Sequence, residues 1–198
     1  MEVRMNFYFL LFDQCESLDL FGPVEIFGAT ENASMHYISM EGGLMTTFQG
    51  AQILTETVET LPEDSVLLVP GGMGTRKLVE DENYLEKLKA LADSATYVLS
   101  VCTGSAVLAA AGLLNGVKAT SNKRAFEWVK TTGPAIWIAK ARWVRDGKYY
   151  TSSGVSAGID MALGFVSDIF GRAAAEENAA RSEYIWDDRA EDDPFAAG

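Results

Sequence analysis

Histidine and cysteine are scarce in this chain of 198 residues, which contains one histidine, His36, and two cysteines, Cys15 and Cys102. Two cysteines are too few for a disulfide framework. Cys-His and Ser-His catalysis, most zinc sites and imidazole general bases all require a well-placed histidine, so each of these functions would depend on His36. The segment 33–40 alternates loosely, as a β-strand does. We therefore interpret His36 as a strand residue, with a catalytic role as the alternative.

Basic side chains and long apolar runs are also few. The 16 Lys and Arg residues are outnumbered by 28 Asp and Glu residues, which gives a formal net charge of −12. The resulting field repels phosphate backbones and no basic cluster interrupts it, so we expect no nucleic acid partner. No segment reaches the roughly 18 uninterrupted apolar residues of a membrane-spanning helix, and the N-terminus lacks the features of a signal peptide. These absences predict a cytoplasmic protein with no membrane partner.

The composition itself is that of a folded domain, with 48% hydrophobic and 22% charged residues. The length predicts one domain over residues 1–198. Apolar runs typical of buried parallel strands occupy 6–12, 65–69 and 95–101, and an amphipathic helix over 84–92 lies between the second and the third. Strand, helix and strand in this order predict a parallel crossover.

The second half of the chain continues this alternation. We expect an apolar helix over 106–114, and then a strand over 136–144 that a turn at Asp146 and Gly147 joins to a second strand. A long helix follows, with Ser156 as its N-cap. The pattern predicts an α/β sandwich with a mainly parallel sheet. Such sheets place their chemistry at the carboxyl ends of the strands.

The strongest local signal is the segment 98–106, in which a buried strand runs into Cys102, small residues follow, and a helix begins. This is the plan of a nucleophile elbow with sulfur in place of the serine oxygen. A thiol near a helix N-terminus is expected to have a lowered pKa, so we predict that Cys102 is a thiolate at neutral pH. The alternative is a small buried hydrophobic residue.

A thiolate that attacks an electrophilic carbon needs donors for the developing charge. Gly71 and Gly72 follow the strand 65–69 and expose backbone N–H groups, and we predict Gly72 as one oxyanion donor. The N–H of Thr103, next to the nucleophile, is the predicted second donor. The alternative for the two glycines is a simple turn.

With His36 set aside, the proton carrier has to be a carboxylate near the end of the first strand. The candidates are Asp13, Glu16, Asp19 and Glu25. Asp19 stands in an apolar setting just before an expected helix. It is either an N-cap, or a desolvated carboxyl with a raised pKa that reaches the sulfur.

Several motifs together resemble the DJ-1/PfpI superfamily, and the match is closest to its isonitrile hydratase branch. They cover nearly the whole chain and lie at residues 19–23, 70–72, 101–105, 153–160 and 194–198. The resemblance implies a three-layer flavodoxin-like sandwich, a homodimer, Cys102 as the nucleophile and Asp19 as the carboxylate beside it.

The sequence also departs from relatives that use a Cys-His pair. Thr103 stands where His often follows the Cys, and Asn122 stands where many relatives have His, which disfavours proteolysis and amidotransfer. We assign Gly71 and Asn122 to substrate binding. Some AraC-like transcription regulators use the same domain as a ligand sensor and continue into a helix-turn-helix domain; because this chain ends at Gly198, we expect no DNA-binding half.

These observations lead to one principal hypothesis, an isonitrile hydratase-like lyase. Cys102 would attack the terminal carbon of the isonitrile, and Asp19 would protonate or position the adduct and the incoming water. Hydrolysis of the thioimidate would release an N-substituted formamide, with no metal or organic cofactor. The alternatives are a glyoxalase-like or deglycase-like activity on small α-oxoaldehydes, and a non-enzymatic redox, stress or small-molecule sensor.

Overall fold

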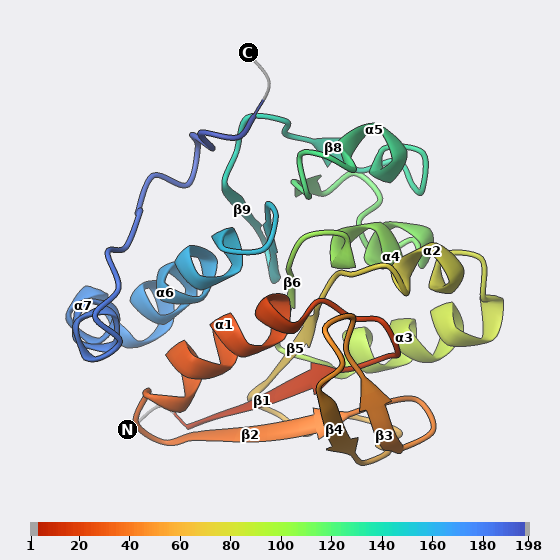
Figure 1. Cartoon of the computed structure of the whole chain (residues 1–198), viewed down its shortest axis with the longest axis horizontal. Helices are drawn as coiled ribbons and strands as arrows, with labels where there is room; N and C mark the ends of the chain where they lie inside the picture. The colour runs from red at the N-terminus through yellow and green to blue at the C-terminus, as the bar shows by residue number, and fades with distance from the viewer. Residues whose placement is uncertain (1–3, 197–198) are drawn as a thin grey trace.

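The computed structural model describes residues 4–196, and its centre is a six-stranded sheet with the order β2-β1-β5-β6-β10-β9 (Figure 1). All neighbouring strands pair in parallel except β9 and β10, which are antiparallel. The strands span, in sheet order, Ala33–Ile38, Met5–Leu10, Ser65–Val69, Tyr97–Ser100, Tyr149–Ser152 and Trp143–Asp146. The predicted mainly parallel sheet is confirmed.

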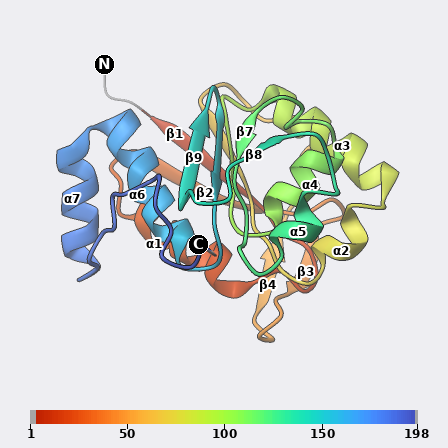
Figure 2. The same cartoon turned by 90° about the horizontal axis from the view of Figure 1, so that it is seen from above.

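Helices cover both faces of this sheet and make three layers (Figure 2). One face carries α1 (Ser17–Gly28), α6 (Ala157–Phe170) and α7 (Arg172–Arg181), and the other carries α2 (Thr75–Leu78), α3 (Glu82–Ser94) and α4 (Gly104–Ala110). Strand β1 is apolar on both faces because it lies between the two layers: Phe7 and Phe9 belong to one core cluster, and Tyr8 and Leu10 to the other. The predicted sandwich is confirmed.

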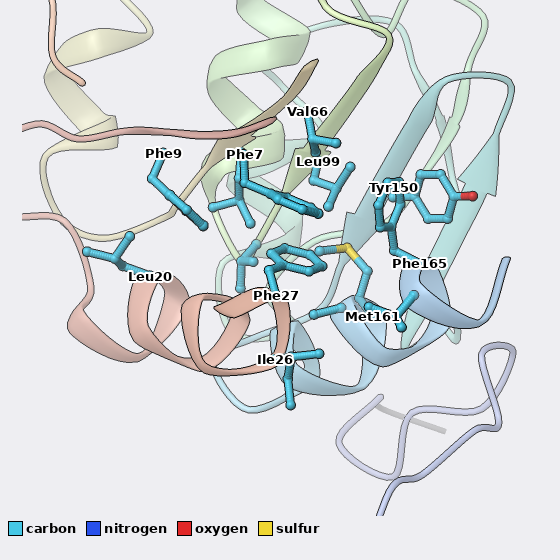
Figure 3. Close-up of a cluster of buried hydrophobic side chains, with 14 of the residues drawn as sticks. Phe7, Phe9, Leu20, Ile26, Phe27, Val66, Leu99, Tyr150, Met161 and Phe165 are labelled. Carbon is cyan, nitrogen blue, oxygen red and sulfur yellow. The ribbon is translucent and has the colours of Figure 1, made fainter. Parts of the chain in front are cut away.

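Aromatic packing fixes helix α1 to the sheet (Figure 3). The ring of Phe27, on α1, stacks on the ring of Phe7, with centroids 4.2 Å apart. Phe165, on α6, meets both rings edge-on. Each buried aromatic side chain contributes roughly 2–3 kcal/mol through removal of apolar area from water. The cluster therefore holds in place the helix on which Asp19 lies.

The structure corrects two details of the predicted second half. Only the end of the expected strand 136–144 joins the main sheet: Ile136–Trp137 forms β8, which pairs with β7 (Lys118–Ala119) in a separate ladder. Between the two strands the carbonyls point to side chains: that of Ile138 accepts from the hydroxyl of Thr120 at 2.8 Å, and that of Ala141 from Nζ of Lys123 at 2.6 Å. Ser156 does precede α6, but its own backbone is already helical and its side chain makes no capping hydrogen bond.

Sequence patterning also left some elements unpredicted. They include the hairpin of β3 (Gly43–Thr46) and β4 (Gln52–Thr55), the short helices α2 and α5 (Phe126–Val129), and helix α7. Over residues 4–196, no helix combines the length and the apolar composition needed to cross a bilayer. His36 lies in strand β2, as predicted, and its ring stacks on that of Tyr8 with centroids 4.5 Å apart.

Candidate active site

Cys102 lies at the turn between strand β6 and helix α4, and its φ of 58° is in the left-handed region. This conformation is strained for a residue with a side chain, so neighbouring groups must hold it. The Cys102 N–H donates to the carbonyls of Ser152 and Ser153, at 3.2 and 3.1 Å. Its carbonyl accepts from the hydroxyls of Ser105 and Ser121, at 3.1 and 2.8 Å. The predicted elbow is present, and hydrogen bonds to both the N–H and the carbonyl of Cys102 stabilise its conformation.

Glycines allow the backbones around this elbow to approach closely. A Cβ on Gly104 would lie 2.2 Å from the carbonyl oxygen of Val69, at the end of β5. A Cβ on Gly71 would lie 2.6 Å from the nitrogen of Thr103 and 2.8 Å from Oδ2 of Asp19. Both positions require glycine, because the backbone atoms that occupy this space cannot move aside.

Asp19 is the third residue of helix α1, and Glu16 occupies the N-cap position. The N-cap interpretation of Asp19 is therefore wrong, because the helix begins three residues earlier than that interpretation requires. The Asp19 side chain is fully buried. Its Oδ2 accepts a hydrogen bond of 2.9 Å from the Gly71 N–H, whereas Oδ1 is buried without such a partner among residues 4–196.

Burial raises the pKa of Asp19 to about 7, and the charge of nearby Glu16 acts in the same direction. The Gly71 N–H and the Cys102 thiol oppose this shift, because both interact favourably with the carboxylate. A carboxyl with a pKa near neutrality can both accept and donate a proton under ordinary conditions. Its position next to the thiol makes Cys102 the group with which it would exchange that proton.

The expectation that Cys102 is a thiolate at neutral pH is not supported. Burial raises the pKa of Cys102 to about 12, and the charge of Asp19 adds to this effect. The Thr103 N–H, the Asn122 side chain and the backbone of Val155 act in the opposite direction but do not outweigh it. The seven-residue helix α4 is short, and desolvation together with a neighbouring negative charge dominates its N-terminal field. Both effects favour the protonated thiol over the thiolate.

The predicted oxyanion donors are already engaged in the structure. The Gly72 N–H donates to the hydroxyl oxygen of Thr103 at 3.1 Å. The N–H of Gly71, the glycine predicted to bind substrate, donates to Asp19. The Thr103 N–H is directed at the Cys102 sulfur. A developing anion would receive the Gly72 N–H only if the Thr103 hydroxyl moved away.

Asn122 contacts the nucleophile directly. Its Nδ2 donates to Sγ of Cys102 at 3.2 Å, and its Oδ1 accepts from the Ala125 N–H at 3.1 Å, which fixes the orientation of the amide. A Cβ on Gly154 would lie 2.5 Å from Nδ2, so the amide also has little room to turn. Sequence reasoning placed Asn122 in the substrate site. In the structure Asn122 both lines the pocket and contacts the sulfur.

A pocket of about 290 Å³ opens above the sulfur. Its walls combine apolar side chains, two arginines and one acid: Glu16, Phe48, Gly72, Met73, Arg76, Cys102, Thr103, Asn122, Arg124, Ala125 and Val155. His36 does not line this pocket. Within residues 4–196, no three His, Cys, Asp or Glu side chains gather as metal ligands would. Sequence patterning gave no sign of Phe48, Arg76 and Arg124. Phe48 and Arg124 lie in turns and Arg76 in the four-residue helix α2, all too short to show periodicity.

The fold and the site define an α/β sandwich protein with a buried cysteine at a nucleophile elbow. Residues 5–168 match the family model described as "DJ-1/PfpI family", and the chain belongs to this family. The resemblance that the motifs indicated is confirmed.

Similarity to known proteins extends over most of the chain. It is 40% identical to the isonitrile hydratase of Pseudomonas putida over 177 residues, which are 89% of this chain and 77% of that protein. It is 29% identical over 182 residues to the HTH-type transcriptional regulator GbdR of Pseudomonas aeruginosa, covering 88% of this chain and 48% of the regulator. A ThiJ/PfpI family protein from Pseudomonas syringae superposes with a TM-score of 0.83 at 31% identity, over 98% of this chain and 79% of that one.

Proposed function

We propose that this protein is an isonitrile hydratase that converts an isonitrile into an N-substituted formamide. The observation that carries the proposal is the 40% identity to the Pseudomonas putida isonitrile hydratase over 89% of this chain. The site supports it, because a buried thiol lies beside a buried carboxyl with a pKa of about 7 and no histidine lines the pocket. The proposal includes a single domain over 1–198 and a homodimer, as the family resemblance implies.

The first half of the reaction forms a thioimidate. The sulfur of Cys102 attacks the terminal carbon of R–N≡C, and its proton passes to the Asp19 carboxylate. Asp19 then delivers that proton to the same carbon, which yields R–N=CH–S–Cys and restores the carboxylate. The Asn122 amide, 3.2 Å from the sulfur, stabilises the charge on sulfur as the proton leaves.

The second half hydrolyses this intermediate. Water adds to the thioimidate carbon while Asp19 takes one of its protons and passes it to the nitrogen, which gives R–NH–CH(OH)–S–Cys and restores the carboxylate. The C–S bond then breaks, the hydroxyl proton passes to the sulfur, and R–NH–CHO leaves. One isonitrile and one water are consumed, and Cys102 returns to the thiol form.

A second candidate function is a small-molecule sensor without catalysis. The similarity to the regulator GbdR, which spans about half of that protein, favours it. A sensor would bind its ligand in the Cys102 pocket and release it unchanged.

The deciding experiment follows formamide formation from an isonitrile by NMR, with methylglyoxal as the substrate for the glyoxalase alternative. Cys102→Ser should abolish formamide formation while leaving the fold intact. Cys15→Ala is the matched control, because Cys15 is fully buried and does not line the pocket; it should keep its turnover while losing about 1 kcal/mol of stability. Binding without turnover would favour the sensor, and activity that depended on Cys15 would reverse the assignment.

A further inference from the structure

The guanidinium of Arg76 includes a buried nitrogen without a hydrogen-bond partner among residues 4–196. Arg76 lies on helix α2 and lines the Cys102 pocket. Its guanidinium carbon lies 3.2 Å from the centroid of the Trp128 ring, so the indole holds one face of the guanidinium. The buried nitrogen is Nη1. The stacking fixes a planar donor group at the wall of the pocket.

Arg76 as a whole is only half-buried, but its Nη1 has lost its hydration without gaining an acceptor, which is costly. Acids outnumber bases by 28 to 16 in this chain, so partners are plentiful. Nevertheless the ion pairs within residues 4–196 include neither Arg76 nor Arg124, the second arginine that lines the pocket. Burial lowers the pKa of Arg76, whereas a Cys102 thiolate would raise it. An arginine nevertheless stays charged under physiological conditions.

We propose that this pocket takes a substrate that bears a carboxylate, which Arg76 binds while the reactive carbon reaches Cys102. The inference rests on the proposed function and names its substrate class, an isonitrile with an acidic group. A planar guanidinium held against an indole matches the two oxygens of a carboxylate better than it matches a neutral group. Phe48 and Met73, both largely exposed, supply apolar walls for the carbon chain between the two ends. Arg124, exposed at the pocket, draws the anion toward a protein whose overall charge repels it.

The test measures how well small acids protect Cys102 from alkylation by iodoacetamide. Linear monocarboxylates from acetate to hexanoate are compared with the amides of the same length, on the wild type, Arg76→Gln and Lys77→Gln. Lys77 is the matched control, because it lies on the same helix, carries the same charge, is exposed and does not line the pocket. Each protection constant is taken relative to the unprotected rate of the same variant, so an effect of Arg76 on thiol reactivity cancels.

In the wild type, the best carboxylate should protect at a concentration about 10-fold to 100-fold lower than its amide, which is the range for a hydrogen bond to a charged group. Arg76→Gln should abolish this preference and Lys77→Gln should keep it. Equal protection by acid and amide in the wild type, or equal losses in the two variants, would overturn the proposal. If thermal unfolding shows that Arg76→Gln does not fold, Arg76→Lys replaces it, and an unreduced preference there counts against the proposal.

The failure of this inference is distinguishable from the failure of the hydratase proposal. Turnover of isocyanoacetate and of its neutral ethyl ester is measured in parallel. If both compounds turn over at equal kcat/KM and carboxylates protect no better than amides, the carboxylate site is excluded and the hydratase proposal stands. If carboxylates protect Cys102 in an Arg76-dependent way but neither compound turns over, the hydratase proposal is excluded and the carboxylate site stands.

Discussion

Nδ2 of Asn122 donates a hydrogen bond to Sγ of Cys102 over 3.2 Å. Asn122 thereby contacts the sulfur itself. An amide cannot take a proton from the thiol, but it can stabilise the negative charge that appears on sulfur once the proton has left. The proton must therefore go elsewhere, and the neighbouring Asp19 carboxyl is positioned to receive it.

Replacing this amide should make the thiol harder to ionise. We expect Asn122→Ala to raise the apparent pKa of Cys102 and to slow both iodoacetamide alkylation and turnover by about 10-fold, as expected for the loss of one hydrogen bond to a charged atom. The measurement is the alkylation rate against pH. An unchanged pH profile would show that the Asn122 amide does not stabilise the thiolate.

Asp19→Asn should separate catalysis from thiol reactivity. The variant keeps an oxygen for the Gly71 N–H but cannot exchange a proton, so we expect kcat to fall by about 10²–10⁴-fold. The charge of Asp19 raises the pKa of Cys102, so removing it should speed alkylation at a given pH. The exposed Glu25 on the same helix provides the control variant Glu25→Gln, which should match the wild type. Full isonitrile turnover by Asp19→Asn would exclude the carboxylate mechanism.

The same substitution should change how stability depends on pH. Burial raises the pKa of Asp19 from 3.8 to about 7. Between these values the folded protein keeps a proton that the unfolded chain releases, so the free energy of unfolding falls as the pH rises. Asp19→Asn has no proton to release, so its free energy of unfolding should not fall in this way. Above pH 7 the variant should be more stable than the wild type by about 1–4 kcal/mol, and the difference should vanish near pH 4. Urea unfolding of both proteins across this range measures it, and a pH-independent difference would contradict the raised pKa.

The proposed homodimer makes a prediction about helix α1. Leu20, Ile26 and Phe27 are buried against the sheet, whereas Leu18 and Phe21 remain 40% and 42% exposed and are available to a second copy. We expect the wild type to sediment as a dimer at micromolar concentration, and Phe21→Glu to weaken that dimer by at least tenfold. Sedimentation velocity on both proteins tests this. A 21.5 kDa monomer in the wild type would remove the dimer.

The parts of the molecule that sequence patterning predicted are those with local signals. β1, β5 and β6 are apolar runs because both of their faces are covered, and the elbow at Cys102 follows from a strand, small residues and a helix in immediate succession. Glu16 at the N-cap lacks a side-chain capping bond, so no capping pattern marked where α1 begins, and Asp19 was assigned to the wrong side of the helix start.

The pocket walls had no comparable local signal. Phe48 comes from the turn of an unpredicted hairpin and Arg76 from a four-residue helix, and only the tertiary fold brings them to Cys102. The sequence predicts a lowered pKa for the Cys102 thiol, whereas the structure raises it, for a related reason. Its main determinants are burial and the Asp19 charge, both of which depend on residues distant in the sequence.

The hydrogen bonds from the Cys102 N–H to Ser152 and Ser153 have a consequence for biosynthesis. These carbonyls belong to the last residue of β10 and to the residue after it, which are translated long after the cysteine itself. A growing chain on the ribosome therefore has the thiol but lacks the groups that hold its backbone in the left-handed conformation. Competence for chemistry should arise only when β10 has paired with β6. Truncated or unfinished chains would then carry a cysteine that lacks the backbone conformation of the elbow.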